Sequence, residues 1–308
     1  MGAAYPQSAC IVCKENNIMA APASNYEIES SDIEYLRHNG KPLLARVFKP
    51  QGKGPFPIVV EIHGGAWCLM DRTNDTPVNE PLARSGVVVI ALDFRMPPDA
   101  PYPASMADIN YGIRWAKAHA AEFGGTADRV GVMGSSSGGH QAMLSAMRPH
   151  DPRYASIPLK SEGPRFDARV NCAILLWPVI DPLGRYRWGK EQKASGQPYP
   201  ELIDLVLPLH DKYWKDEAEM DEGNPTRALE RGERAETPSV LYVQGKLDLA
   251  HPRPHLDRFV SAYQKIGGKL ELALFDDVAE GFIVRKPDAP ASAQAITRII
   301  DFVHRQNA

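Results

Sequence analysis

Six short apolar runs, separated mostly by segments long enough for a helix, constrain the fold of this sequence more than any other feature. They occupy 58–62, 87–92, 130–133, 173–177, 240–243 and 270–275. Parallel strands that helices cover on both faces are buried throughout, so they appear as nearly continuous apolar runs. Helical patterns occur at 104–123, 138–147, 256–266 and 291–303. The alternation predicts an α/β fold with a mainly parallel, doubly wound sheet.

Two parts of the chain depart from this alternation. Residues 35–37 and 43–48 look like strands on either side of the turn His38-Asn39-Gly40, and Asn-Gly is a strong hairpin signal, so an antiparallel start is predicted. Over 183–236 no strand is predicted, and so long a connection inside a compact domain is usually functional. We therefore predict one domain, 1–308, with an N-terminal arm at 1–25 and a helical cap inserted at about 183–236.

Composition and charge exclude several classes of function. The 35 basic and 38 acidic residues give a formal net charge of -3. The chain therefore lacks the excess of positive charge that binding to nucleic acid or to an anionic membrane requires. No run of eighteen apolar residues and no secretory signal pattern is found, so we expect a cytoplasmic protein. Four cysteines make no disulfide framework, and the Cys10-x-x-Cys13 pair lacks the second pair of a zinc site. The expected partner is a small-molecule substrate, and the sequence leaves a homodimer open.

The strongest chemical signal is 134–139, Gly-Ser-Ser-Ser-Gly-Gly, which matches G-x-S-x-G with Ser136 at its centre. An apolar run leads into the motif and a helical pattern follows it. A tight turn between strand and helix exposes the serine oxygen of such a motif as a nucleophile. A phosphate-binding loop would also be rich in glycine, but this loop has no lysine. The context favours a nucleophilic serine.

A second motif, His63-Gly64-Gly65-Ala66-Trp67, directly follows the first central strand. Its two glycines allow backbone N–H groups to approach a substrate oxygen. Together with the N–H of Ser137, the residue after the nucleophile, Gly64 and Gly65 are predicted to form an oxyanion hole. His63 is interpreted as a support for this loop and not as a base.

With these motifs, the chain resembles the hormone-sensitive-lipase and acetyl-esterase branch of the α/β hydrolases, from about residue 40 onward. The resemblance also rests on Asp93-Phe94-Arg95, Pro103-Ala104 with Asp108, Asn224-Pro225 and the turn at 245–248. It implies the α/β-hydrolase fold with a lid, and hydrolysis of short acyl esters without cofactor or metal. It also maps the acid of the catalytic triad onto Asp248, which follows a predicted strand.

The third member of the triad is where this sequence departs from the family. The family has a histidine directly before Gly-Phe in the loop after the last strand, but here Glu280 precedes Gly281-Phe282. Histidine normally titrates near pH 6.5 and glutamate near 4.3, so a glutamate base would need burial or a like charge to raise its pKa. Asp248 would supply that charge. The prediction is a Ser136, Asp248 and Glu280 site.

Three explanations of this departure stay open. Glu280 is the base, or a histidine from elsewhere reaches Ser136, or the site no longer hydrolyses anything. His251 lies three residues after Asp248, His210 lies in the predicted cap, and His140 lies one helical turn after Ser136. Each of the three is interpreted first as an ordinary structural histidine. A serine hydrolase that cleaves a small or medium carboxylic ester, or a lactone or amide, through an acyl-enzyme on Ser136 is the favoured function. A lyase, decarboxylase, cyclase or dehydratase, or a binding protein that lost turnover, is the alternative.

The sequence offers two kinds of candidate for substrate binding. The aromatic residues Trp67, Trp188, Trp214 and Phe282 are predicted to line a pocket for an apolar or aryl group. The alternative for the aromatic residues of the cap is that they form the core of the cap. Four cations in the predicted cap are candidates to attract a substrate carboxylate, although a run of charges is usually a solvated face: Arg185, Arg187, Lys190 and Lys193.

Overall fold

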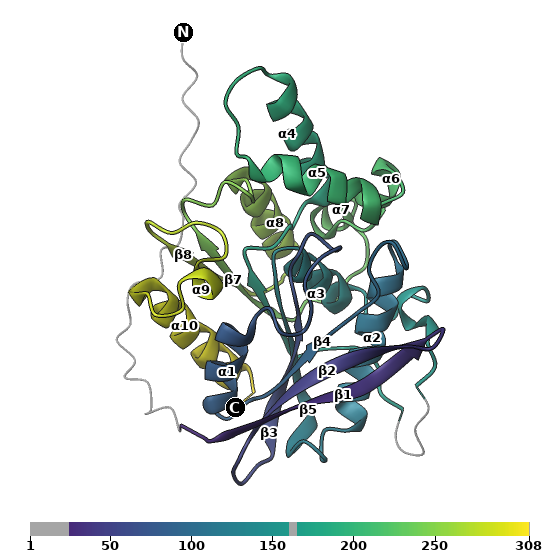
Figure 1. Cartoon of the computed structure of the whole chain (residues 1–308), viewed down its shortest axis with the longest axis vertical. Helices are drawn as coiled ribbons and strands as arrows, with labels where there is room; N and C mark the ends of the chain where they lie inside the picture. The colour runs from purple at the N-terminus through teal and green to yellow at the C-terminus, as the bar shows by residue number, and fades with distance from the viewer. Residues whose placement is uncertain (1–24, 160–164, 308) are drawn as a thin grey trace.

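The computed structural model describes residues 25–159 and 165–307, and they form one eight-stranded sheet (Figure 1). The predicted N-terminal arm and the pair Cys10 and Cys13 lie outside the described residues, apart from residue 25. The sheet order is β1-β2-β4-β3-β5-β6-β7-β8. The strands are β1 (Ile28–His38), β2 (Lys41–Pro50), β3 (Phe56–Ile62), β4 (Val88–Leu92), β5 (Gly125–Ser135), β6 (Cys172–Leu176), β7 (Ser239–Gly245) and β8 (Leu270–Phe275).

Strand directions agree with the pattern in the sequence. β1 and β2 form an antiparallel hairpin and β2 pairs antiparallel with β4, whereas the pairs from β4 through β3 to β8 are all parallel. The hairpin turns at Asn39 and Gly40, whose φ angles of 48° and 83° explain the choice of Asn-Gly. The predicted doubly wound parallel sheet with an antiparallel start is confirmed.

Helices cover both faces of this sheet and bury its side chains in alternation. Ile58 and Val60 of β3 face one apolar layer, with residues of α2, α3 and α8, and Val59 faces the other, with residues of α1 and α10. This arrangement makes the carboxyl ends of the strands the open edge where loops can build a site. The helices outside the cap are α1 (Thr76–Arg84), α2 (Ala104–Ala118), α3 (Ser137–Met147), α8 (Arg253–Lys265), α9 (Phe282–Arg285) and α10 (Pro290–Gln306).

Two of these helices were not predicted, for local reasons. Helix α1 contains Pro77 near its start and Pro81 in its interior, and an interior proline argues against a helix in a sequence. Helix α9 is only four residues long, too short to show a period. Nothing among the described helices is long and apolar enough to cross a membrane.

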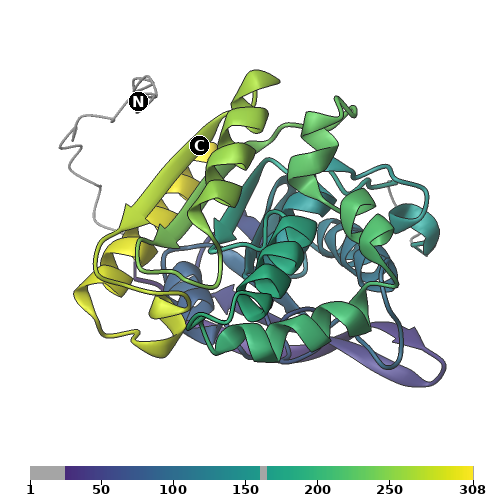
Figure 2. The same cartoon turned by 90° about the horizontal axis from the view of Figure 1, so that it is seen from above.

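The segment between β6 and β7 is helical, as expected from its lack of strand patterns. It contains α4 (Pro182–Ala194), α5 (Leu202–Tyr213), α6 (Glu217–Glu222) and α7 (Pro225–Glu230). Figure 1 shows α4 and α5 at the top of the molecule, beyond α3 and α8, and Figure 2 shows the same helices from above. Their function as a lid stays a prediction.

Candidate active site

Ser136 lies in a strained turn between β5 and α3. Its φ of 51° and ψ of -114° are unusual for any residue with a side chain. The turn is held from both sides, because the Ser136 N–H donates to Leu176 O at 2.9 Å and its carbonyl accepts from the Val179 N–H at 2.9 Å. A Cβ atom at Gly138 would collide with the backbone of Ile62. The geometry matches a nucleophile elbow, which presents the Ser136 hydroxyl at the sheet edge.

The loop after β7 brings together a buried carboxylate and a buried imidazole. Asp248 Oδ1 accepts hydrogen bonds from the N–H groups of Ala250 and His251 at 2.8 and 3.0 Å. Its other oxygen, Oδ2, lies 2.9 Å from His251 Nδ1. Gln244 donates to the His251 carbonyl at 2.8 Å and so fixes the backbone of the loop. The loop therefore sets both the position and the orientation of the His251 ring.

His251 also reaches the serine. Its Nε2 lies 3.4 Å from Ser136 Oγ, and only 5% of His251 is exposed. An ionised Asp248 can only accept, so Nδ1 carries the proton and Nε2 keeps a free lone pair that faces the serine. Contacts between nucleophile and base are often loose before substrate binds. The arrangement can take the Ser136 proton and hold the resulting positive charge beside Asp248.

Glu280 does not occupy the position that the sequence suggested. Its Oε2 accepts from Arg285 Nη2 at 2.6 Å, and no hydrogen bond joins its carboxylate to Ser136 or Asp248 in the described part of the chain. Glu280 does border the cavity at Ser136, so the expectation that it faces the site holds only in that sense. The contact expected of Glu280 is made by His251, because the loop after β7 delivers the imidazole in place of the loop after β8.

The loop after β3 lies directly against the serine. A Cβ at Gly64 would lie 3.5 Å from Ser136 Cβ, and Gly65 has a φ of 97° that glycine adopts without strain. Within residues 25–159 and 165–307, no hydrogen bond occupies the N–H groups of Gly64, Gly65 and Ser137. The Trp67 N–H donates to Ser137 Oγ at 3.0 Å and ties the loop to α3. The three free N–H groups are thus available to a ligand oxygen near Ser136.

Two buried histidines support this loop, and neither ring forms a hydrogen bond with Ser136 in the part of the chain that the structure describes. The ring of His63 stacks on Phe94 at 4.3 Å, and its Nδ1 contacts the Gly64 carbonyl at 2.9 Å. His140 Nδ1 accepts from the Trp67 indole at 3.1 Å, so its Nε2 carries a proton that it donates to the Gly223 carbonyl. Burial lowers the pKa of His140 to about 4, which keeps its ring neutral. His63 fits the supporting role inferred from the sequence.

A buried carboxyl pair below the loop was missed at the sequence level. Ser135 Oγ donates to Asp75 Oδ2 at 2.6 Å, and Asn79 donates to Glu61 Oε2 at 3.4 Å. Burial first, and the nearby Asp75 carboxylate second, raise the pKa of Glu61 well above its usual range. The two carboxyl groups thus lie close together in a site where burial favours the neutral form of Glu61. A glutamate inside an apolar run was the available signal, since such a residue needs a buried partner.

The cavity at Ser136 has a volume of about 340 Å³, enough for a small or medium ligand. Its walls come from the loop after β3, from the cap and from the loops after β7 and β8. They include Gly64, Gly65, Leu69, Met70, Asp75, Trp177, Arg185, Leu205, Val206, Leu209, His251, Glu280 and Val284.

None of the four aromatic residues predicted to bind substrate lines this cavity. Trp67 and Trp214 are 0% and 1% exposed and pack on each other with ring centroids 5.7 Å apart. Phe282 packs on Trp177 at 5.6 Å, and Trp188 borders a separate small hollow in the cap. The prediction is corrected, because Trp67, Trp214 and Phe282 are buried in the core of the cap and of the loops, and the partly buried Trp188 lies away from Ser136.

His210, another candidate base, is also part of that core. It is fully buried, its ring lies 4.8 Å from that of Trp67, and neither ring nitrogen has a hydrogen-bond partner among the described residues. Burial first, and the charge of Arg185 second, lower its pKa well below the usual range. His210 does not border the cavity that contains Ser136.

Comparisons with known proteins show what this chain is similar to. A family model described as BD-FAE matches residues 46–197. Among curated proteins of Mycobacterium tuberculosis (strain ATCC 25618 / H37Rv), the esterase LipC is 26% identical over 266 residues, which cover 82% of this chain and 60% of LipC. The probable carboxylic ester hydrolase LipM is 33% identical over 129 residues, 42% of this chain and 29% of LipM. The chain therefore spans less than two thirds of the length of these relatives.

A solved structure extends the likeness over nearly the whole chain. The esterase LipW from Mycobacterium marinum superposes with a TM-score of 0.72 at 23% identity, and the match covers 91% of this chain and 82% of LipW. The chain therefore has the α/β-hydrolase fold, as the sequence motifs implied.

Proposed function

We propose that this α/β-hydrolase-fold chain is a serine hydrolase that cleaves a small or medium carboxylic ester through an acyl-enzyme on Ser136. One observation carries the proposal: His251 contacts Ser136 Oγ at 3.4 Å through Nε2 and Asp248 Oδ2 at 2.9 Å through Nδ1. A serine, a base and a group that orients the base are the parts that nucleophilic acyl transfer needs. The names of LipC and LipM support the same chemistry.

The first half-reaction forms the acyl-enzyme. His251 Nε2 takes the proton of Ser136 as Oγ attacks the carbonyl carbon of the ester. The carbonyl oxygen becomes an oxyanion, which accepts hydrogen bonds from the N–H groups of Gly64, Gly65 and Ser137. The carbon–oxygen bond to the leaving group then breaks, and His251 gives its proton to the departing alcohol.

The second half-reaction repeats these steps with water. His251 takes a proton from a water molecule that attacks the acyl carbon, and the same N–H groups stabilise the new oxyanion. The bond to Ser136 Oγ breaks, His251 returns the proton to Oγ, and the carboxylic acid leaves. The Asp248 carboxylate stabilises the imidazolium at each half-reaction. No step in this scheme requires Glu280.

The cap contributes a wall of the substrate pocket in this proposal. Leu205, Val206 and Leu209 of α5 border the cavity at Ser136. Because apolar side chains from the cap face the serine, changes in this segment should alter which esters fit. This contact supports the function of 183–236 as a lid.

The glutamate at position 280, where the family has a histidine, is a reason to expect a reaction of another class. His251 removes that reason, because it supplies a proton acceptor in contact with Ser136. A binding protein without turnover would not need a serine, an imidazole and a carboxylate in contact, and among enzymes this arrangement fits nucleophilic acyl transfer best. We therefore keep ester hydrolysis as the proposed function.

Covalent labelling of the serine tests the proposal. A fluorophosphonate probe should label Ser136, as located by peptide mass spectrometry, and short-chain 4-nitrophenyl esters should be hydrolysed. Ser136→Ala should abolish labelling and lower kcat/KM by several orders of magnitude. The exposed serine variant Ser195→Ala is the control and should behave as the wild type. Unlabelled Ser136, or wild-type rates in Ser136→Ala, would exclude the acyl-enzyme.

A further inference from the structure

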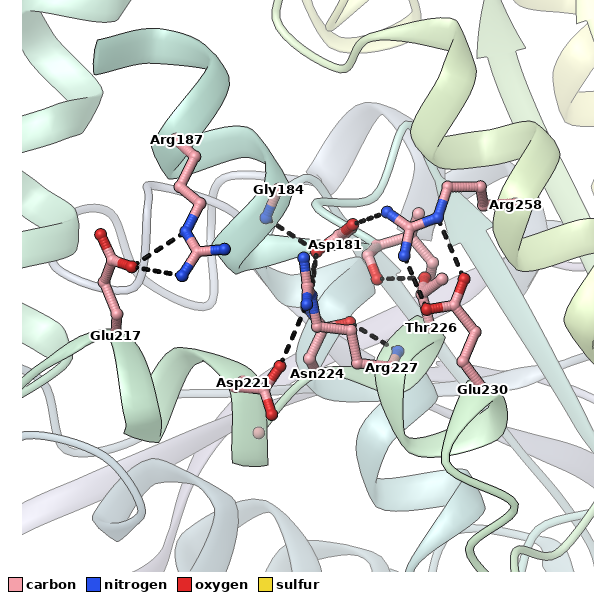
Figure 3. Close-up of polar contacts among 12 residues, drawn as sticks. Asp181, Gly184, Arg187, Glu217, Asp221, Asn224, Thr226, Arg227, Glu230 and Arg258 are labelled. Carbon is pink, nitrogen blue, oxygen red and sulfur yellow. Dashed lines mark hydrogen bonds and ion pairs between the residues drawn. The ribbon is translucent and has the colours of Figure 1, made fainter. Parts of the chain in front are cut away.

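Helix α4 carries four cations, and three of them have an evident partner. Arg187 pairs with Glu217 at 2.7 Å, as Figure 3 shows, and Lys193 pairs with Asp204 at 2.6 Å. The ammonium of Lys190 lies 5.0 Å from the centre of the Tyr186 ring. These three side chains lie on the outer side of the cap and match the solvated charges expected of such a run.

Arg185 differs from the other three in burial and in pairing. Only 4% of this residue is exposed, and its guanidinium forms no hydrogen bond or ion pair with any residue that the structure describes. A buried guanidinium without a partner is costly, and a ligand anion that pairs with it would offset that cost. Burial lowers the pKa of Arg185 to about 10, and the side chain therefore stays charged at pH 7.

Arg185 borders the cavity that contains Ser136 and His251. Its place is fixed at the base of the cap, where the Arg185 N–H donates to Asp181 O at 2.9 Å. The Asp181 carboxylate accepts from the Gly184 N–H at 2.8 Å and from Arg258 at 2.7 Å, as Figure 3 shows. The helix start that carries Arg185 is thus tied to α8 and does not move freely.

Two acidic residues lie near Arg185, but each is already engaged. Glu280 pairs with Arg285 at 2.6 Å. Asp248 accepts from the His251 ring through one oxygen and from two backbone N–H groups through the other. Neither carboxylate makes an ion pair with Arg185, so its positive charge is available to a molecule in the cavity.

We propose that Arg185 binds a carboxylate of the substrate, so that the preferred substrates are esters that also carry a free carboxylate. This inference rests on the proposed ester hydrolysis at Ser136. The planar fork of a guanidinium matches the two oxygens of a carboxylate, and one guanidinium balances one negative charge. Leu205, Val206 and Leu209 supply an apolar wall for the chain that links the carboxylate to the ester.

Matched pairs of esters test this inference and also locate the carboxylate. Monoethyl adipate against ethyl heptanoate varies the acyl side, and 4-acetoxybenzoate against 4-ethylphenyl acetate varies the alcohol side. In at least one pair the wild type should prefer the anion, and Arg185→Met should lower that preference roughly 10- to 100-fold, mostly through KM. Arg187→Met, on the same helix, should leave the preference unchanged. An equal preference in wild type and Arg185→Met for both pairs would overturn the inference.

Further variants separate a binding role from a structural one. Arg185→Lys keeps the charge without the fork and should retain part of the preference, whereas Arg185→Gln should lose it. If the melting temperature of Arg185→Met shows that it does not fold, these two variants replace it in the ester comparison. Loss of activity on neutral and anionic esters alike in folded Arg185→Gln would indicate a structural role and overturn the inference.

Binding without turnover distinguishes this inference from the proposed function. Calorimetry with the Ser136→Ala variant should detect monoethyl adipate or 4-acetoxybenzoate, and the Ser136→Ala/Arg185→Gln variant should bind roughly 10- to 100-fold more weakly. If the wild type hydrolyses neither ester of a pair and is not labelled, ester hydrolysis fails while this comparison still reports on Arg185. If neutral esters are hydrolysed and Arg185→Gln binds the anions equally well, only the carboxylate site fails.

Discussion

The loops after β7 and β8 lie side by side and both border the cavity at Ser136, but they carry different chemistry. The first holds Asp248 and His251, both more than nine-tenths buried. The second holds Glu280, which pairs with the exposed Arg285. The two loops are joined where the Leu247 N–H donates to the Val278 carbonyl at 3.0 Å. Neighbouring strand ends can therefore deliver an imidazole to nearly the same place, and chain order does not decide which loop does so.

The difference has a simple geometric basis. Asp248 accepts from the N–H of His251, which folds the loop back so that residues three apart meet. The same fold brings the His251 ring against the carboxylate and towards Ser136. One loop thus supplies both the base and the group that orients it, which leaves Glu280 free to pair with Arg285.

Among the variants that test the difference between the two loops, His251→Asn is expected to lower activity most. Loss of the imidazole removes the only proton acceptor that contacts Ser136 Oγ among the described residues, so kcat/KM should fall by at least about 10⁴-fold. The assay is hydrolysis of the best short-chain 4-nitrophenyl ester. His255→Asn, on the helix that follows the loop, should stay within a few-fold of the wild type. Near-normal rates in His251→Asn would mean that another residue acts as the base.

A somewhat smaller loss is expected from Asp248→Asn, which keeps the shape of the loop. The amide cannot stabilise the imidazolium and no longer fixes the proton on Nδ1, so kcat should fall by about 10³- to 10⁴-fold. Steady-state kinetics measures this change. Asp257→Asn removes an exposed carboxylate from α8 and should have little effect. A loss below tenfold in Asp248→Asn would mean that Asp248 only shapes its loop.

The smallest effect on activity is expected from Glu280→Gln, in the loop after β8. Because the Glu280 carboxylate pairs with Arg285 and not with Ser136 or Asp248, kcat should change less than about tenfold. Asp276→Asn, in the same loop, provides a matched exposed change. If Glu280→Gln were as damaging as His251→Asn, a carboxylate base in the loop after β8 would replace the present proposal.

Short-range patterns in the sequence were enough for the fold and for the serine. A buried parallel strand, a hairpin turn at Asn39-Gly40 and the elbow around Ser136 each depend on neighbouring residues, because steric limits on the backbone act locally. The motif at 63–67 could be placed for the same reason, since it directly follows a strand, whereas the acid was mapped onto Asp248 by the resemblance to a known family. The parallel strands other than β5 were predicted to within two residues at each end, whereas the strands predicted at 35–37 and 130–133 are parts of the longer β1 and β5.

Contacts between distant segments decided the rest. The sequence contained both His251 and Glu280, but only the packing of two neighbouring loops showed which side chain contacts Ser136. Trp67 and Trp214 belong to the core because they bury one another. Asp75 lies close to Glu61 and Ser135, which come from two neighbouring strands. Of four cations on α4, tertiary packing buried Arg185 alone at the cavity. The free energy of burial depends on what surrounds a side chain in space, which a pattern along the chain does not record.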